Sequence, residues 1–174
     1  MVVVGLGLLV IISPSVLRYC VEASLISYGG SLGNKKAIGF NLKLLSVVSS
    51  QEYLESRAAV FAGPDDKPIW AISLGLKGEK GMQYLQRIAN DTQGNARIQA
   101  LVGIGWSEPA MLRAYLEQYE GDVRRWRETV GAVRVLEAKE YIPLIESQLK
   151  THPELQDGLV EAWLNEIGGS GRRR

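Results

Sequence analysis

The sequence predicts an all-α protein, a right-handed α-solenoid of about four to five stacked helical hairpins with a C-terminal capping helix. Two observations predict it. The chain has 174 residues, 46% of them hydrophobic, which fits one domain with a sizeable core. Apolar residues or glycine also recur every 30 residues, a spacing typical of stacked helical repeats. Five columns follow this period: Ala71, Leu101 and Gly131; Ile72, Val102 and Ala132; Leu76, Trp106 and Leu136; Met82, Leu112 and Ile142; Leu85, Tyr115 and Ile145.

Each unit of the repeat reads as two short amphipathic helices separated by turn residues. In residues 95–119, Ile98, Leu101 and Val102 share one side of a first helix, and Leu112 and Leu116 share one side of a second. The same pattern predicts hairpins at 2–27, 34–61, 64–90, 95–119 and 122–150, and a closing helix at 153–167. We divide the chain into an apolar N-terminal hairpin or membrane anchor (1–30), the repeat domain (31–167) and a flexible basic tail (168–174).

Capping residues place several helix starts. The predicted N-caps are Ser13, Ser107 and Asp122, and the predicted capping boxes are Ser49 with Glu52 and Thr151 with Glu154. Residues 35–48 fit both the alternation of a strand and the spacing of a helix. Their place in the repeat favours a helix.

The N-terminal segment is uncharged up to Leu17 and admits three interpretations. In the first, Val2 to Ile12 pairs with an amphipathic helix that starts after Ser13. In the second, the segment anchors the protein in a membrane, although a helix of this length spans about 26 Å of a core about 30 Å thick. In the third, it is a removed signal peptide, although no Lys or Arg precedes the apolar run.

The repeat pattern also resembles a known family. Leu136, Ile142, Pro143 and Ile145 match the Leu…Ile-Pro-x-Leu signature of short HEAT-like repeats, such as those of phycobiliprotein lyases. The resemblance covers roughly residues 33–150 and implies a fold more than an activity. Tetratricopeptide repeats are longer, and their Trp…Leu-Gly…Tyr signature is absent.

Composition and motifs exclude several classes of function. A formal net charge of +1 argues against binding nucleic acid through bulk charge. One Cys and one His, His152, cannot form a His/Cys zinc site. The glycines of 5–7 and 29–36 lack the spacing of nucleotide-binding loops, and no nucleophile–base pair or carboxylate pair stands in a catalytic context. The sequence therefore predicts no metal and no cofactor, and leans away from an enzyme.

Two sets of polar residues are candidate binding surfaces. The first is a ladder on the second helices, which usually form the concave wall of a solenoid: Arg57, Gln83, Arg87, Arg113, Glu117 and Ser147. It suits a peptide or an acidic segment, or it is an ordinary solvated face. The second is a basic patch of Arg124, Arg125, Arg127 and Arg134, which suits phosphate contacts or is also a solvated helix face.

These observations favour a non-catalytic protein–protein interaction scaffold or assembly factor. Solenoid ends need polar capping faces, and the closing helix offers one through Glu154, Gln156, Asp157, Glu161 and Glu166. Val2 to Ile12 is apolar all round, so a partner protein, a second copy or a membrane is expected to cover it. A cytoplasmic or membrane-associated location is favoured over secretion. The alternatives are a bilin lyase-like enzyme, implied by the resemblance with Tyr53, Tyr84 and Tyr115 as groove aromatics, and a nucleic-acid-binding repeat.

Overall fold

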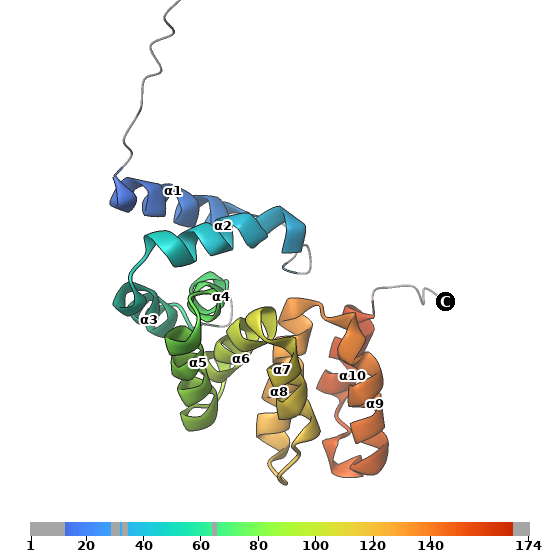
Figure 1. Cartoon of the computed structure of the whole chain (residues 1–174). Coiled ribbons are helices and arrows are strands. Elements are labelled where there is room, and N and C mark those ends of the chain that lie inside the picture. The colour runs from blue at the N-terminus through green and yellow to red at the C-terminus, as the bar shows by residue number, and fades with distance from the viewer. Residues whose placement is uncertain (1–12, 29–31, 33–34, 64–65, 169–174) are drawn as a thin grey trace, which may run out of the picture.

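The computed structural model describes residues 13–28, 32, 35–63 and 66–168, and within these it is all helical (Figure 1). The described part contains no strand, which confirms the predicted all-α class. The α-helices are α1 (Pro14–Ser27), α2 (Lys35–Val48), α3 (Gln51–Val60), α4 (Ile69–Leu76), α5 (Glu79–Asp91), α6 (Asn95–Ser107), α7 (Pro109–Glu117), α8 (Val123–Leu136), α9 (Ile142–Thr151) and α10 (Gly158–Ile167), with short 3-10 turns η1 (Lys139–Tyr141) and η2 (Pro153–Leu155).

Contacts between helices follow the order of the chain. Helix α2 packs against α4, α4 against α6, α6 against α8, and α8 against α10. The intervening helices pack beside this row: α3 on α4, α5 on α4 and α6, and α7 on α6 and α8, while α1 packs on α2 (Figure 1). Residues 35–48 form a helix, as their place in the repeat predicts.

The period-30 columns supply much of the core. The columns that begin at Ala71 and Ile72 are buried in all three units, on α4, α6 and α8. Two glycines let the backbones approach closely. A Cβ at Gly81 would lie 1.9 Å from the Leu74 carbonyl oxygen, and one at Gly103 would lie 2.5 Å from the Ala71 carbonyl oxygen. Side chains at these positions would therefore push α5 and α6 away from α4.

Of the five predicted cap residues, Ser13 and Asp122 cap a helix, and Ser49, Ser107 and Thr151 do not. Ser13 Oγ accepts a hydrogen bond from the Val16 amide (3.3 Å), and the Asp122 carboxylate accepts one from the Arg125 amide (3.0 Å). At α3 the cap is Ser50, which accepts from the Tyr53 amide, rather than the preceding serine. Ser107 is the last residue of α6, so it does not cap α7.

The predicted start of the closing helix was wrong. Thr151 ends α9, and its hydroxyl donates to the Ser147 carbonyl one turn back (3.1 Å). That bond commits the hydroxyl to α9 instead of to a new helix. Residues 153–155 form a 3-10 turn, and α10 begins at Gly158, where Asp157 accepts from the Leu159 amide (2.6 Å).

Several side chains donate to the carbonyl end of an earlier helix. Lys67 Nζ donates to the carbonyls of Ile26 (2.7 Å) and Tyr28 at the end of α1. Lys77 Nζ donates to the carbonyls of Ser46 and Ser49 at the end of α2 (2.9 and 2.6 Å). These bonds satisfy carbonyls that lack partners inside their own helix. Lys77 joins successive units, and Lys67 joins the unit 64–90 to α1.

The N-terminal and C-terminal segments lie largely outside this description. Val2 to Ile12 and residues 169–174 are outside the described residues, so the predicted first helix and the basic tail stay predictions. Among the described helices, none combines the length and the apolar character needed to cross a bilayer.

Candidate functional site

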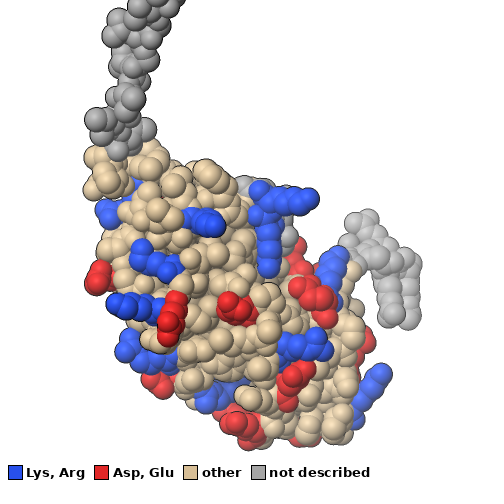
Figure 2. Space-filling model, in the orientation of Figure 1, with Lys and Arg blue, Asp and Glu red and all other residues tan. Residues whose placement is uncertain are grey.

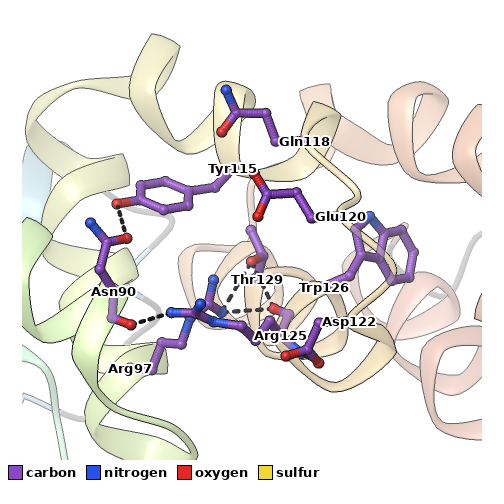
Figure 3. Close-up of a pocket in the computed structure, with 9 residues that line it drawn as sticks. All are labelled: Asn90, Arg97, Tyr115, Gln118, Glu120, Asp122, Arg125, Trp126 and Thr129. Atoms are coloured by element: carbon purple, nitrogen blue, oxygen red, sulfur yellow. Dashed lines mark hydrogen bonds between the residues drawn. The ribbon is translucent and has the colours of Figure 1, made fainter.

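A polar cavity of about 280 Å³ lies between α5, α6, α7 and α8 (Figure 3). Arg97 and Arg125 lie close together in it. Tyr115 points toward Asn90, and its hydroxyl donates a hydrogen bond to Asn90 Oδ1 (3.1 Å). Its lining residues are Asn90, Arg97, Tyr115, Gln118, Glu120, Asp122, Arg125, Trp126 and Thr129.

The two arginines of the cavity cap a helix. Arg97 is only 4% exposed. Its Nε donates to the Ala89 carbonyl near the end of α5 (2.8 Å), and one terminal nitrogen donates to the Arg125 carbonyl (2.7 Å). The Arg125 guanidinium donates to the carbonyls of Ala89 and Asn90. A cation at a helix C-terminus complements the helix dipole, so both arginines stabilise the joint between α5 and the following units.

A buried carboxylate balances this cluster. Glu128 of α8 lies 3.6 Å from the Arg97 guanidinium and accepts hydrogen bonds from the Gly94 amide (2.7 Å) and Arg124 Nε (3.2 Å). Gly94 precedes α6, so the carboxylate sits at the positive end of that helix. Burial lowers the pKa of Arg97, and the Glu128 charge opposes that shift.

The charged side chains of the cavity that form these contacts therefore have structural roles. Its cations are bonded to helix ends. Among the described residues, no cluster of three or more His, Cys, Asp or Glu side chains is arranged to hold a metal ion. His152 lies at the end of α9, where its ring packs edge-on against Tyr119 at 4.7 Å and its Nδ1 lies 3.4 Å from Glu154.

A second buried carboxylate holds α1 in place. Glu22, 7% exposed, accepts hydrogen bonds from the Tyr53 hydroxyl of α3 (2.7 Å) and from Trp70 Nε1 of α4 (2.9 Å). The Arg18 guanidinium stacks 4.0 Å above the Tyr53 ring. Burial raises the pKa of Tyr53, and the bond to Glu22 adds to that rise. The apolar helix α1 is thus attached by a directional polar contact.

The predicted ladder is present as a set of separate helix-surface residues. Arg57 stacks on Phe61 (4.2 Å), Arg87 stacks on Tyr84 (5.3 Å), and Gln83 donates to Glu79 one turn back. On α7, Arg113 pairs with Glu117 at 2.9 Å. Ser147 is exposed on α9. Arg57 also lies 4.9 Å from the Trp70 ring of the next hairpin. Among the described residues, no hydrogen bond or ion pair joins a ladder residue of one hairpin to a ladder residue of another.

The predicted basic patch is divided among intramolecular partners. Arg124 pairs with Glu128 one turn along α8, and Arg125 turns inward to the end of α5. Arg127 pairs with Asp157, and Arg134 pairs with Glu166 of α10 (2.7 Å). The patch thus ties α8 to its neighbours on both sides.

The tyrosines proposed as groove aromatics also have partners. The Tyr84 hydroxyl donates to the Glu55 carbonyl (3.4 Å), as the Tyr53 hydroxyl does to Glu22 and the Tyr115 hydroxyl to Asn90. All three hydroxyls join one unit to the unit before it. No observation at these positions favours a bilin-binding role over this structural one.

The surface of α1 and α2 differs from the rest of the molecule. We define the N-terminal face as its five exposed large apolar residues, with exposed fractions of 50–75%: Val16, Tyr19, Ile26, Phe40 and Val47. In the rest of the described chain, only Val60 and Leu159 are comparable. The exposed charges on α1 and α2 are Lys35, Lys36 and Lys43. Figure 2 accordingly shows tan and blue but no red over these two helices.

Comparison with known proteins adds no further assignment. No family model matches the chain, and no curated protein or solved structure is significantly similar to it. The HEAT-like resemblance therefore stays a prediction.

Proposed function

We propose that the protein is a non-catalytic interaction scaffold, a right-handed α-solenoid of HEAT-like hairpins that docks through its N-terminal face. The observation that carries this proposal is the concentration of exposed apolar side chains on α1 and α2. Apolar residues gathered on one surface mark interaction sites, whereas scattered ones need no explanation.

The contacts between units support the repeat architecture. Several polar contacts join residues 31 positions apart, close to the period in the sequence. They are Glu22 with Tyr53, Leu42 with Ser73, Ser46 with Lys77, and Arg97 with Glu128. Equivalent positions of neighbouring units touch in this way when hairpins stack in register.

The polar groups support binding rather than catalysis. The buried charged residues Glu22, Arg97 and Glu128 all bond to groups on neighbouring units. Their role in these contacts is to fix the geometry of the array. The exposed apolar residues of the N-terminal face are not among these contacts.

Site-specific photo-crosslinking in cells tests this proposal. A photoreactive side chain in place of Phe40 reports on the N-terminal face, and one in place of Leu159 of α10 is the matched control. Both positions are exposed and apolar, at opposite ends of the chain. We expect adducts, with protein or lipid, at position 40 and none above background at 159. Equal yields at the two positions would refute docking through this face.

A further inference from the structure

We propose that the N-terminal face binds the surface of an anionic lipid membrane, with α1 and α2 lying on that surface. This inference rests on the proposed docking role of the face and names its partner. It follows from the apolar stripe of α1, the mixed stripe of α2, the distribution of charge along the chain and the residues that precede α1.

Helix α1 has two apolar sides. Val21 and Leu25 are buried against the body of the protein, where Glu22 also bonds to α3 and α4. The opposite side exposes Val16, Tyr19, Ala23 and Ile26, spaced three, four and three residues apart, which places them on one line along the helix. The helix is fixed by its inner side, so the outer side is presented as a preformed apolar strip.

Helix α2 carries a stripe of alternating character. Lys36, Phe40, Lys43 and Val47 are all exposed and are spaced four, three and four residues apart, so they too share one line. A helix that lies in a lipid interface combines apolar side chains that enter the interface with lysines whose stems reach toward the headgroups. The stripe of α2 has this composition. Each lysine near an anionic bilayer contributes about a fivefold gain in binding.

Charge is divided unevenly along the chain. Residues 1–48 contain four Lys or Arg and one acidic residue, a formal charge of +3. That acidic residue, Glu22, is buried and hydrogen-bonded. Residues 49–174 contain 16 basic and 18 acidic residues, a formal charge of −2. An anionic surface therefore attracts the N-terminal end and favours an orientation with the remaining units pointing away from it.

The chain beyond the described residues continues this apolar character. Residues 1–12 consist of Met, Val, Gly, Leu and Ile only, and they join α1 at Ser13, three residues before Val16 of the face. The sequence that precedes α1 is therefore also without charged side chains and apolar, a composition that a lipid interface favours.

A second copy of the protein fits the face less well. In a two-fold dimer the same patch meets itself, so Lys36 and Lys43 would approach their own copies. In a head-to-tail pair the N-terminal face would meet the α9–α10 end, where Leu159 is the one exposed large apolar residue among those described. Neither arrangement covers the apolar side chains and also neutralises the lysines.

Vesicle flotation of the full chain tests the inference. The probes are vesicles of phosphatidylcholine alone and vesicles of phosphatidylcholine mixed with phosphatidylserine. We expect the protein to float with the mixed vesicles, and the bound fraction to fall as salt is raised. Aggregated protein without lipid does not float, so the readout separates binding from self-association.

Charge-matched variants locate the binding surface. We expect K36Q/K43Q to lower partition into the mixed vesicles about 25-fold, from two lysines at about fivefold each. K139Q/K150Q removes the same charge from exposed positions on η1 and α9 and is expected to leave partition unchanged. Phe40→Ser is expected to weaken binding to the mixed vesicles without changing its salt dependence.

Three outcomes would overturn the inference: no flotation, equal flotation with both vesicle types, or equal loss in the two lysine variants. A stable oligomer that Phe40→Ser dissociates, without flotation, would assign the face to a second copy. If flotation fails while photo-crosslinking at Phe40 persists, only the choice of a lipid partner is wrong. If both fail, the proposed docking function is wrong as well.

Discussion

At the C-terminal end, α10 is held to α8 by two ion pairs, Arg127–Asp157 and Arg134–Glu166. Its outer surface carries exposed acidic residues such as Glu161 and Glu166. At the N-terminal end, α1 is held to α3 and α4 by the buried Glu22, and its outer side exposes the large apolar residues Val16, Tyr19 and Ile26. The C-terminal helix is thus held by ion pairs at the surface, whereas α1 is held by hydrogen bonds to a buried carboxylate.

The difference shows what each end is adapted to face. A helix whose polar groups point outward closes the array against water, as an end unit must. A helix whose polar group points inward has its outer side free for an apolar partner. The two ends therefore respond differently to substitution.

The largest difference is expected between neighbouring residues of α1. Leu25 is 2% exposed and Ile26 is 50% exposed. We expect Leu25→Ala to lower the free energy of unfolding by about 3 kcal/mol, and Ile26→Ala to change it by less than about 0.5 kcal/mol. Urea denaturation of the two variants measures this. A large cost at position 26 would mean that the outer side of α1 contributes to folding, not only to docking.

The next largest effect concerns Glu22. Glu22→Ala leaves the Tyr53 hydroxyl and Trp70 Nε1 without their acceptor, at a cost of about 2 kcal/mol. Glu22→Gln keeps an acceptor oxygen and is expected to recover part of that loss. Chemical denaturation gives the two values. If the two variants are equally stable, the carboxylate is not what fastens α1.

A smaller effect is expected at the C-terminal end. Asp157 caps α10 through the Leu159 amide and also pairs with Arg127. Asp157→Ala is expected to cost about 1 kcal/mol, and Arg134→Ala, at an exposed pair, about 0.5 kcal/mol. The cost of Arg134→Ala should shrink in high salt. Glu161→Ala, at an exposed position of the same helix, is the control in thermal unfolding.

The smallest effect at neutral pH is expected from the tyrosines. Burial raises the pKa of Tyr53 near the N-terminal end and of Tyr141 in the last hairpin from the ordinary value of 10.0. A raised pKa means that the folded protein holds the proton more tightly than the unfolded chain does. The contribution of these tyrosines to stability is therefore constant below pH 10 and is lost as pH rises through their raised pKa values.

Circular dichroism and tyrosinate absorbance, followed together during alkaline titration, measure this fall. Tyr53→Phe and Tyr141→Phe should each make it shallower. Unfolding that runs well ahead of tyrosinate formation would assign alkaline instability to other groups.

The helices were predictable because their apolar spacing repeats. Four predicted hairpins, from 34–61 to 122–150, correspond to the pairs α2–α3 to α8–α9. Helix starts were less predictable where two candidates compete. Ser49 and Ser50 are adjacent, and the hydroxyl of Thr151 has an alternative acceptor inside α9.

The polar contacts were harder to predict. Arg97 and Glu22 were not singled out because a charged residue in a sequence is expected at the surface. Their burial depends on partners distant along the chain, such as Glu128 for Arg97 and Trp70 for Glu22. The period offered a usable signal, since Arg97 and Glu128 are 31 residues apart. The predicted ladder and patch assumed solvent-exposed side chains, whereas Arg57, Arg125, Arg127 and Arg134 are half-buried against neighbouring groups.

The bonds from side chains to the carbonyl ends of earlier helices make tolerance to mutation one-sided. Lys67, Lys77 and Arg97 supply the donors, whereas the acceptors are main-chain oxygens that any residue provides. A saturation mutagenesis scan that measures folding stability should thus find the donor positions intolerant. It should find Ile26 permissive, although the main-chain carbonyl of Ile26 accepts one of these bonds. The residue that supplies the acceptor can therefore change during evolution while the hydrogen bond is kept. A comparison of sequences would then reveal the donor position but not the acceptor position.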